Sequence, residues 1–368
     1  MKKRGADALS APLFSPDDGL LFCAAVLYCA YHNGGGAAVL YYLDLNTTDP
    51  ALNLATEQYV FDALPREHSY FMLWQNDRAV IIGKHQNTLS EINEDYVRAQ
   101  GIRVVRRLSG GGAVYHDLGN LNFTFVTDAG HTETLDFRLF CLPIVRTLET
   151  LGVHAEVNGR NDITIDGRKF SGNSQYLRGG RVMHHGTILF DSDLSVVQSA
   201  LRVDPEKIRA KGVRSVRSRV TNVREHLPRE IPLAEFRRIL LENVVRENGG
   251  EEYRLTPEDR AAVERLREER YASWEWNYGA SPECTLMRRG RVEGCGSVEV
   301  YLTVEHGLIS NVEFRGDFFS VDEPETLAAR FIGRRPEPED YAAALEGTEV
   351  SRYFMGMTED ALLAILCR

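Results

Sequence analysis

Three consecutive glycines, Gly110 to Gly112, stand between a pair of arginines and a group of polar side chains. Arg106-Arg107 precede the glycines, and Tyr115-His116-Asp117 follow them. Glycine lets the backbone approach a ligand where a Cβ would collide, and free N–H groups in a turn suit an anion. Arginine adds forked donors for a carboxylate or a phosphate. A hairpin between two core strands would explain the glycines alone. A hairpin does not require the flanking arginines or the polar residues that follow, so the stretch predicts an anion-binding site.

A second group of polar residues follows an Asp166-Gly167 turn. Lys169 stands at the end of a predicted strand, beside Ser171-Gly172-Asn173. A lysine beside a glycine turn is a common surface arrangement when it stands alone. Further on, His184 and His185 are neighbours in a predicted strand and therefore point to opposite faces of it. That geometry argues against one metal ion held by both rings.

These residues need strands and helices to position them. Asp49-Pro50 predicts the start of a helix that continues to about Leu64. The alternation of Leu121, Phe123 and Phe125 predicts a half-buried strand. Asn76-Asp77 predicts a tight turn between two strands, and Asp166-Gly167 predicts a hairpin. The other predicted elements are strands at Val39–Leu43, Tyr70–Gln75, Ala79–Ile82 and around His184, and helices at Ile92–Ala99 and Leu135–Leu151, the last with Cys141 as a small buried hydrophobe.

The composition is that of an ordinary globular protein. The chain has 368 residues, enough for one large or two medium domains, and 43% of them are hydrophobic. A net charge of −10 argues against a general nucleic-acid-binding protein, which needs a basic face. The 6 cysteines are scattered without ligand or disulfide spacing, which is typical of the reducing cytoplasm.

The first 38 residues fit poorly with the rest. The basic end, Met1 to Arg4, is separated from the apolar run Leu20 to Ala30 by residues that include Asp17-Asp18, which argues against an export signal. We hypothesise that the true start lies near Val39 or Leu40, with Asn33 to Gly36 encoded by a purine-rich ribosome-binding site. Residues 1–38 would then be a disordered or wrongly assigned extension, and their deletion should leave activity and stability intact.

Four blocks of the sequence, in content and order, resemble lipoate–protein ligases, the enzymes that adenylate lipoic acid and attach it to a carrier lysine. The blocks are Arg106 to Asp117 with Gly119-Asn120, Gly159 to Asp162, Lys169 to Gly172, and His184 to Thr187. The resemblance implies an α/β (α+β) fold. A large catalytic domain with a mixed sheet, of the type of biotin and lipoate ligases and related to class II tRNA synthetases, would precede a small α+β domain.

The resemblance also implies where the domains meet. Ser273 to Tyr278 matches the segment that closes the family's large domain, so the boundary is expected near Gly279 to Pro282. A catalytic domain at residues 39–278 and an accessory domain at 283–368 follow from it. The accessory domain is expected to hold strands at Cys284–Met287, Ser297–Val304 and Leu308–Phe314, a glycine-rich loop at Arg288–Gly296, and helices at Pro324–Phe331, Glu337–Leu345 and Thr358–Leu366.

By the same resemblance, Lys169 is the catalytic ammonium, which touches the lipoate carboxylate and the α-phosphate of ATP and lowers their repulsion. Trp74 would form an aromatic wall against the lipoate arm, whose four methylenes contribute about 3 kcal/mol when buried, with core packing as its alternative role. The ATP and adenylate site would comprise Arg107, Gly112, Ala113, Val114, Tyr115, Asp162, Lys169 and Lys211, with Asp162 as a partner of Mg²⁺. The lipoate site would comprise Trp74, Ser109, Gly111, His116, Lys169, Gly172 and His185. Ser174 stands where many ligases have alanine, which adds a hydroxyl to the pocket floor.

The stretch from Arg202 to Arg224 holds eight Lys and Arg residues against two acids. A solvated helix and loop is one reading of it. The resemblance instead implies a cover over the adenylate that excludes water, with a charge suited to acidic carriers. The expected carriers are the lipoyl domains of 2-oxoacid dehydrogenase E2 subunits and the glycine-cleavage H protein. We expect a cytoplasmic monomer that binds neither nucleic acid nor membranes.

Two other functions remain open at this stage. An octanoyl- or lipoyl-transferase that works without ATP would need a reactive cysteine near Lys169, and none occurs between Cys141 and Cys284. A non-catalytic sensor or carrier-binding homologue would be marked by loss of Lys169, which is present. A biotin ligase is disfavoured because its Gly-Arg-Gly loop is missing.

Overall fold

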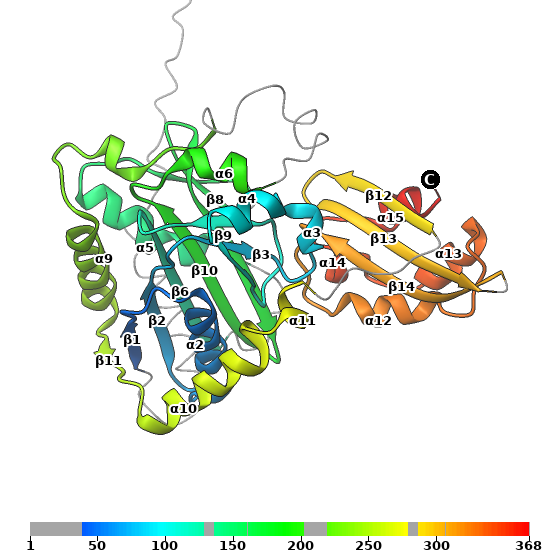
Figure 1. Cartoon of the computed structure of the whole chain (residues 1–368), viewed down its shortest axis with the longest axis horizontal. Coiled ribbons are helices and arrows are strands. Elements are labelled where there is room, and N and C mark those ends of the chain that lie inside the picture. The colour runs from blue at the N-terminus through cyan, green and yellow to red at the C-terminus, as the bar shows by residue number, and fades with distance from the viewer. Residues whose placement is uncertain are drawn as a thin grey trace, which may run out of the picture.

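The computed structural model describes residues 39–128, 136–159, 161–201, 219–278, 286–305 and 307–367. Figure 1 shows a larger part built around one wide sheet and a smaller part at the C-terminal end. The proposed N-terminal extension, the boundary residues Gly279 to Pro282, Lys211 and most of the basic stretch, residues 202–218, lie outside the described residues.

An eight-stranded mixed sheet forms the larger part. Its strands are β1 (Leu40–Asp44), β2 (Ser69–Trp74), β6 (Asn120–Asp128), β7 (Glu156–Asn158), β8 (Asp162–Ile165), β9 (Arg168–Arg178), β10 (Arg181–Leu189) and β11 (Glu251–Glu252). They lie in the order β11-β1-β2-β6-β10-β9-β8-β7. β1 pairs in parallel with β2 and β11, and the pairs from β2 to β7 are antiparallel. This sheet confirms the predicted α/β class.

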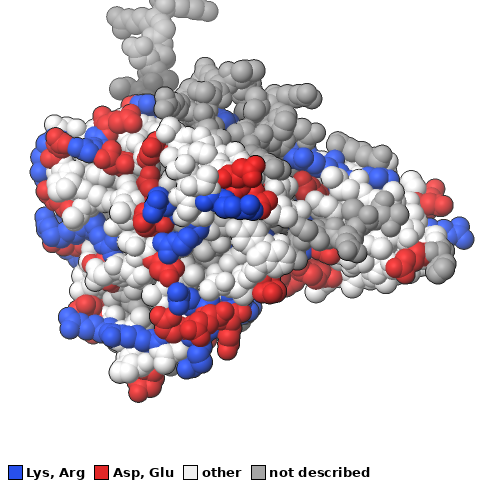
Figure 2. Space-filling model, viewed as in Figure 1, with Lys and Arg blue, Asp and Glu red and all other residues white. Residues whose placement is uncertain are grey.

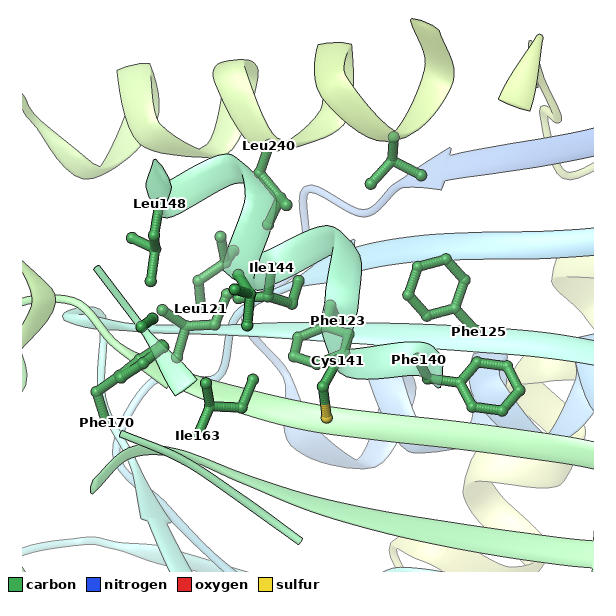
Figure 3. Close-up of a cluster of buried hydrophobic side chains, with 14 of the residues drawn as sticks. Leu121, Phe123, Phe125, Phe140, Cys141, Ile144, Leu148, Ile163, Phe170 and Leu240 are labelled. Atoms are coloured by element: carbon green, nitrogen blue, oxygen red, sulfur yellow. The ribbon is translucent and has the colours of Figure 1, made fainter. Parts of the chain in front are cut away.

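Helices cover both faces of the sheet (Figure 1). The helices on one face are α2 (Pro50–Ala63) and α10 (Pro257–Leu266), and those on the other are α5 (Arg138–Thr150) and α9 (Leu233–Asn248). Successive strand residues point to opposite faces, so Met72 and Trp74 pack towards α2 while Phe71 and Leu73 pack towards α5. Figure 3 shows Cys141 of α5 among apolar side chains of the α5 face, such as Phe123 and Ile144, and it is fully buried as predicted. Its thiol has a pKa raised by burial, which makes it a poor nucleophile.

Because helices cover both faces of the large sheet, one prediction about strand burial was wrong. The strand containing Phe123 was expected to be half-buried, but every residue of β6 from Asn120 to Thr127 is buried. The cause is the position of β6 in the middle of the sheet, between β2 and β10, where helices occupy both sides. The alternating side chains of β6 therefore point to two faces that are both buried. One face is apolar, and the other carries buried polar groups such as Asn122 and Thr124.

The glycine run lies in the connection between two strands of a second, three-stranded sheet. β3 (Ala79–Ile82) lies between β4 (Arg103–Arg106), to which it is parallel, and β5 (Val114–His116), to which it is antiparallel. Asn76-Asp77 therefore does not close a hairpin between β2 and β3, as the sequence predicted; it carries the chain from one sheet to the other. The predicted helix at Ile92–Ala99 is found as α4 (Glu94–Ala99), which begins two residues later because Ile92 forms a bridge to Leu201, and the short helix α3 (Thr88–Glu91) before it was not predicted.

The C-terminal part has its own sheet and core. Its strands β12 (Leu286–Val292), β13 (Gly296–Glu305) and β14 (Leu308–Gly316) form an antiparallel sheet. Helices α12 (Pro324–Ala328), α13 (Pro338–Leu345), α14 (Val350–Tyr353) and α15 (Glu359–Leu366) complete the module. The predicted loop at Arg288–Gly296 was wrong, since its first half is strand β12 and only the turn to β13 is loop. The other predicted strands and helices of this part are found, although Cys284 and Thr285 of the first predicted strand lie outside the described residues.

Acidic and basic side chains alternate over the face shown in Figure 2. Within the described ranges, no helix has the length and hydropathy to span a membrane.

Candidate active site

A cavity of about 150 Å³ opens between the large sheet, the glycine run and the C-terminal part. Three kinds of wall enclose it. The glycine run and β5 supply Gly111, Gly112, Ala113, Val114 and His116, joined by Arg107; the large sheet supplies Trp74, Asn122, Lys169, Gly172, Asn173, Ser174, His185, Gly186 and Thr187; and Leu54, Ile81, Asn161 and Phe319 complete the lining. Most of the predicted site residues therefore lie around one cavity.

The floor of the cavity is set by the register of the large sheet. Trp74 of β2 pairs with Asn122 of β6, which pairs with Thr187 of β10. The Thr187 hydroxyl accepts a hydrogen bond from the Gly172 backbone N–H of β9 at 3.2 Å. One row of side chains thus crosses four strands. His185 and Ser174 are register partners in the next row on the same face.

Lys169 stands at the β9 end of this row. Its Nζ lies 2.6 Å from Asp162 Oδ1, and both side chains are about one-third exposed. A Cβ built on Gly172 would lie 2.8 Å from the same Nζ, so glycine leaves room for the lysine to reach the cavity. The predicted hairpin is found as β8 and β9, with Asp166 and Gly167 in left-handed conformations at its turn, and it brings Lys169 and Asp162 together.

Arg107 lies beneath the glycine run. Its guanidinium donates to the carbonyls of Gly110 at 2.6 Å, Gly112 at 2.9 Å and Ile81 at 3.2 Å. Burial lowers the pKa of Arg107 to about 10, so it keeps its charge at neutral pH. Most of its donors hold the loop in shape, and its charge faces the cavity that the residue lines.

Arg106, its neighbour, does not contribute to the cavity. Its guanidinium donates to the carbonyls of Gly83, Lys84 and Gln86 and to the Thr88 hydroxyl. The sequence suggested an anion donor at this position, and that interpretation was wrong. The side chain points away from the cavity and ties the loop after β3 to the end of the larger part through the Trp276 carbonyl.

A buried chain of polar groups lies behind the floor. The Glu57 carboxylate of α2 accepts a hydrogen bond from His185 Nδ1 at 3.0 Å, and His185 Nε2 lies 2.6 Å from Ser109 Oγ. Ser174 donates to the same Ser109 oxygen at 2.7 Å, which uses the extra hydroxyl noted in the sequence. This serine–histidine–glutamate order matches that of hydrolases, but Ser109 is 1% exposed and does not line the cavity. Its place is behind His185, whose ring it fixes.

Trp74 both lines the cavity and packs in the core. Its indole N–H donates to Thr124 Oγ1 at 2.9 Å, and the Thr124 hydroxyl donates in turn to Glu57. The aromatic wall is therefore held by the same polar chain that orients His185. Trp74 therefore belongs both to the cavity lining and to a buried apolar cluster.

Three predicted residues are absent from the lining of the cavity, and a fourth is not described. Ser109 lies behind the floor, and Asp162 meets the cavity through Lys169. The Tyr115 side chain points to the opposite side of β5, into an apolar cluster, which leaves only its backbone for a ligand. Lys211 belongs to the residues that are not described.

Phe319 is a lining residue that the sequence did not indicate. It belongs to the C-terminal part, is 1% exposed, and packs against Phe137 at 5.3 Å. Phe318 beside it accepts a hydrogen bond from Gly111 N at 3.1 Å, and a Cβ on Gly110 would lie 2.4 Å from the same carbonyl oxygen. Two of the three glycines therefore serve the docking of the C-terminal part.

The geometry defines a two-part enzyme with a cationic, partly apolar cleft, and comparison with known proteins agrees. The chain matches the lipoyl protein ligase A/B catalytic domain over residues 49–245 and the bacterial lipoate protein ligase C-terminus over residues 281–366. It is 43% identical to the lipoate–protein ligase LplJ of Bacillus subtilis, over 87% of this chain and 98% of that protein. It is 42% identical to lipoate–protein ligase 1 of Staphylococcus aureus, with the same coverage. The chain belongs to the family of lipoate–protein ligases, which are enzymes.

Solved structures show the same fold. P. falciparum LipL1 in complex with lipoate superimposes with a TM-score of 0.72 at 23% identity, over 88% of this chain and 97% of that one. A lipoate–protein ligase A bound with ATP gives a TM-score of 0.55 at 26% identity, over 66% of this chain and 98% of that one.

Proposed function

We propose that this protein activates lipoate with ATP to form lipoyl adenylate and then transfers the lipoyl group to a lysine of a carrier protein. A carboxylate oxygen of lipoate attacks the α-phosphorus, and pyrophosphate leaves. The carrier amine then attacks the mixed anhydride, AMP leaves and an amide forms. Relatives solved with lipoate and with ATP support these two substrates.

The position of Lys169 carries the proposal. Its ammonium group stands at the end of the partly apolar cavity, 2.6 Å from Asp162. Two anions, a carboxylate and a phosphate, must approach one another for adenylation. An ammonium group that contacts both stabilises the negative charge that develops between them. Arg107 adds a second positive charge below the glycine run, whose remaining backbone donors suit phosphate oxygens.

Magnesium fits this arrangement in its usual manner. Among the described residues, no group of three His, Cys, Asp or Glu side chains gathers to hold a metal ion. Mg²⁺ is commonly held by one or two carboxylates together with substrate phosphates. Asp162 would supply such a carboxylate, and the bound ion would neutralise charge on the phosphates.

The carriers we propose are lipoyl domains of 2-oxoacid dehydrogenase E2 subunits and the glycine-cleavage H protein. A structure at 29% identity, with a TM-score of 0.58, is of a bi-partite lipoate protein ligase and its E2 lipoyl domain from Thermoplasma acidophilum. We further propose that the enzyme acts as a cytoplasmic monomer. Size-exclusion chromatography with light scattering, alone and with an apo lipoyl domain, tests both the oligomeric state and the carrier.

Pyrophosphate release with ATP, Mg²⁺ and lipoate, octanoate or biotin tests the reaction. Lys169→Ala should abolish release and lipoylation while changing stability by no more than about 1 kcal/mol, since its ion pair is partly exposed. Arg168→Ala is the matched control, because Arg168 adjoins Lys169 on the same strand but pairs with Glu225 and His226. Full activity of Lys169→Ala would refute the proposal.

A further inference from the structure

His116 lines the cavity, and one of its ring nitrogens meets no hydrogen-bond partner among the described residues. Its ring is 3% exposed and its Nε2 has no hydrogen-bond partner there. Burial, followed by the nearby charges of Arg107 and His185, lowers the pKa of His116 to about 3. The imidazole is therefore neutral at physiological pH and carries a single proton.

Two asparagines decide which ring nitrogen holds that proton. Asn53 Nδ2 lies near three oxygens, so this atom must be the amide nitrogen. The oxygens are those of the Thr47 carbonyl at 3.3 Å, the Gln75 carbonyl at 2.8 Å and Asn76 Oδ1 at 2.9 Å. Because Asn76 gives its oxygen to Asn53, it turns its own Nδ2 to His116 Nδ1, at 3.1 Å. Nδ1 accepts this bond, and the proton is therefore on Nε2.

His116 lies at the end of the cavity opposite Lys169. Its ring packs edge-on against Trp74, with centroids 6.1 Å apart. Trp74 begins the row of floor residues that ends at Gly172, beside Lys169. Three strand spacings separate the two ends, or about 14 Å. That span suits an extended eight-carbon acid with one polar contact at each end.

Asn122 supplies a second polar atom without a partner on the same wall. Its Nδ2 is buried and bonds to no atom among the described residues, and its Oδ1 accepts from Asn120 at 2.8 Å. Both Asn122 and His116 line the cavity. Two unpaired polar groups beside an aromatic wall indicate that the far end of the ligand is not a plain hydrocarbon.

We propose that the Nε2–H group of His116 donates to a sulfur of the lipoate dithiolane ring and so makes the enzyme prefer lipoate to octanoate. The inference rests on the proposed function, which places the carboxylate at Lys169. A disulfide sulfur is a weak acceptor, whereas the terminal methyl group of octanoate is none. Octanoate leaves a buried donor unpaired, and sites built around a hydrogen bond reject analogues that lack the partner.

The ratio of kcat/KM for lipoate over octanoate, measured by pyrophosphate release, tests this role. His116→Met removes the donor at similar size, and the ratio should fall about fivefold to tenfold, the weak end of the range for a lost hydrogen bond. His116→Gln restores a donor and should recover most of the ratio. His154→Gln, at a histidine whose side chain is 72% exposed, is the control.

A second measurement does not depend on turnover. Nitrogen-15 NMR of the imidazole rings should show the His116 proton on Nε2 in the free protein, and lipoate but not octanoate should shift that resonance. Asn76→Asp presents a carboxylate to Nδ1, so above the pKa of the pair the proton should move there and the preference for lipoate should fall.

The outcomes separate the two ideas. A wild-type protein that activates neither acid refutes the proposed function. Active enzyme with an unchanged ratio in His116→Met, or a proton found on Nδ1 in the wild type, overturns the role of His116 alone.

Discussion

Gly110→Ala should loosen the docking of the C-terminal part. The new Cβ would lie 2.4 Å from the Phe318 carbonyl oxygen and 3.2 Å from Phe319 Cα. Both are backbone atoms, so no side chain can rotate out of the way. The Phe318 ring is also fixed, because it stacks on His85 at 4.7 Å with an angle of 11° between the rings. Relief requires a backbone shift of about 1 Å, and such overpacking costs about 1–3 kcal/mol.

Gly112→Ala is the matched control in the same loop. Its Cβ would meet only Asp317 Cβ, at 3.9 Å, and neither Gly110 nor Gly112 has a positive φ. The two substitutions therefore differ in the clash and not in backbone strain. Gly112→Ala should change stability by less than about 0.5 kcal/mol.

Chemical denaturation and hydrogen exchange measure the effect. Gly110→Ala should lower the unfolding midpoint and speed exchange of the Gly111 amide, which donates to Phe318, and of the Gly316 amide, which donates to His85 at 2.9 Å. Gly112→Ala should leave both protected. Equal stability and equal protection in the two variants would refute the assignment of Gly110 to docking.

Three further outcomes are expected. Arg106→Met should lower the free energy of unfolding by about 3 kcal/mol, because it leaves several buried carbonyls unpaired, and urea denaturation checks it. Burial lowers the pKa of His85, His116 and His184, so below about pH 6.5 the unfolded chain binds more protons and stability falls, by about 1.4 kcal/mol per histidine at one pH unit lower. A flat unfolding midpoint between pH 7.5 and 5.5 would contradict this. Trp74→Phe should weaken lipoate binding in calorimetry, since it removes cavity wall and the bond to Thr124; unchanged affinity would place Trp74 in the core alone.

The sequence predicted the cavity through local blocks. Lys169 and Gly172 lie on one hairpin, and the glycine run leads directly into His116, so the blocks that carry the resemblance to lipoate–protein ligases also lie around one cavity. Arg106 and Arg107 show the limit. Adjacent positions were interpreted alike, but strand geometry sends one guanidinium to loop carbonyls and the other below the glycines.

Glu57 and Phe319 could not be found from local signals. Glu57 lies on a helix whose polar residues look solvent-facing, and it is buried because α2 is enclosed between the sheet and α10. Phe319 reaches the cavity from the C-terminal part, and its partner Phe137 is far away in sequence. Such contacts depend on the tertiary arrangement, which periodicity does not encode.

The pairing of β1 with β11 has a consequence for synthesis on the ribosome. Tyr41 of β1 is the register partner of Glu251 of β11. The ribosome therefore makes about 210 further residues after β1 before its partner strand β11 exists. At 5–20 residues per second, that interval is about 10–40 s. Arg106 has a shorter interval of about 170 residues, but its partners Trp276 and Asn277 are made later still, after Glu251. During this time one edge of the nascent sheet remains unpaired, and the growing chain is a natural client for chaperones.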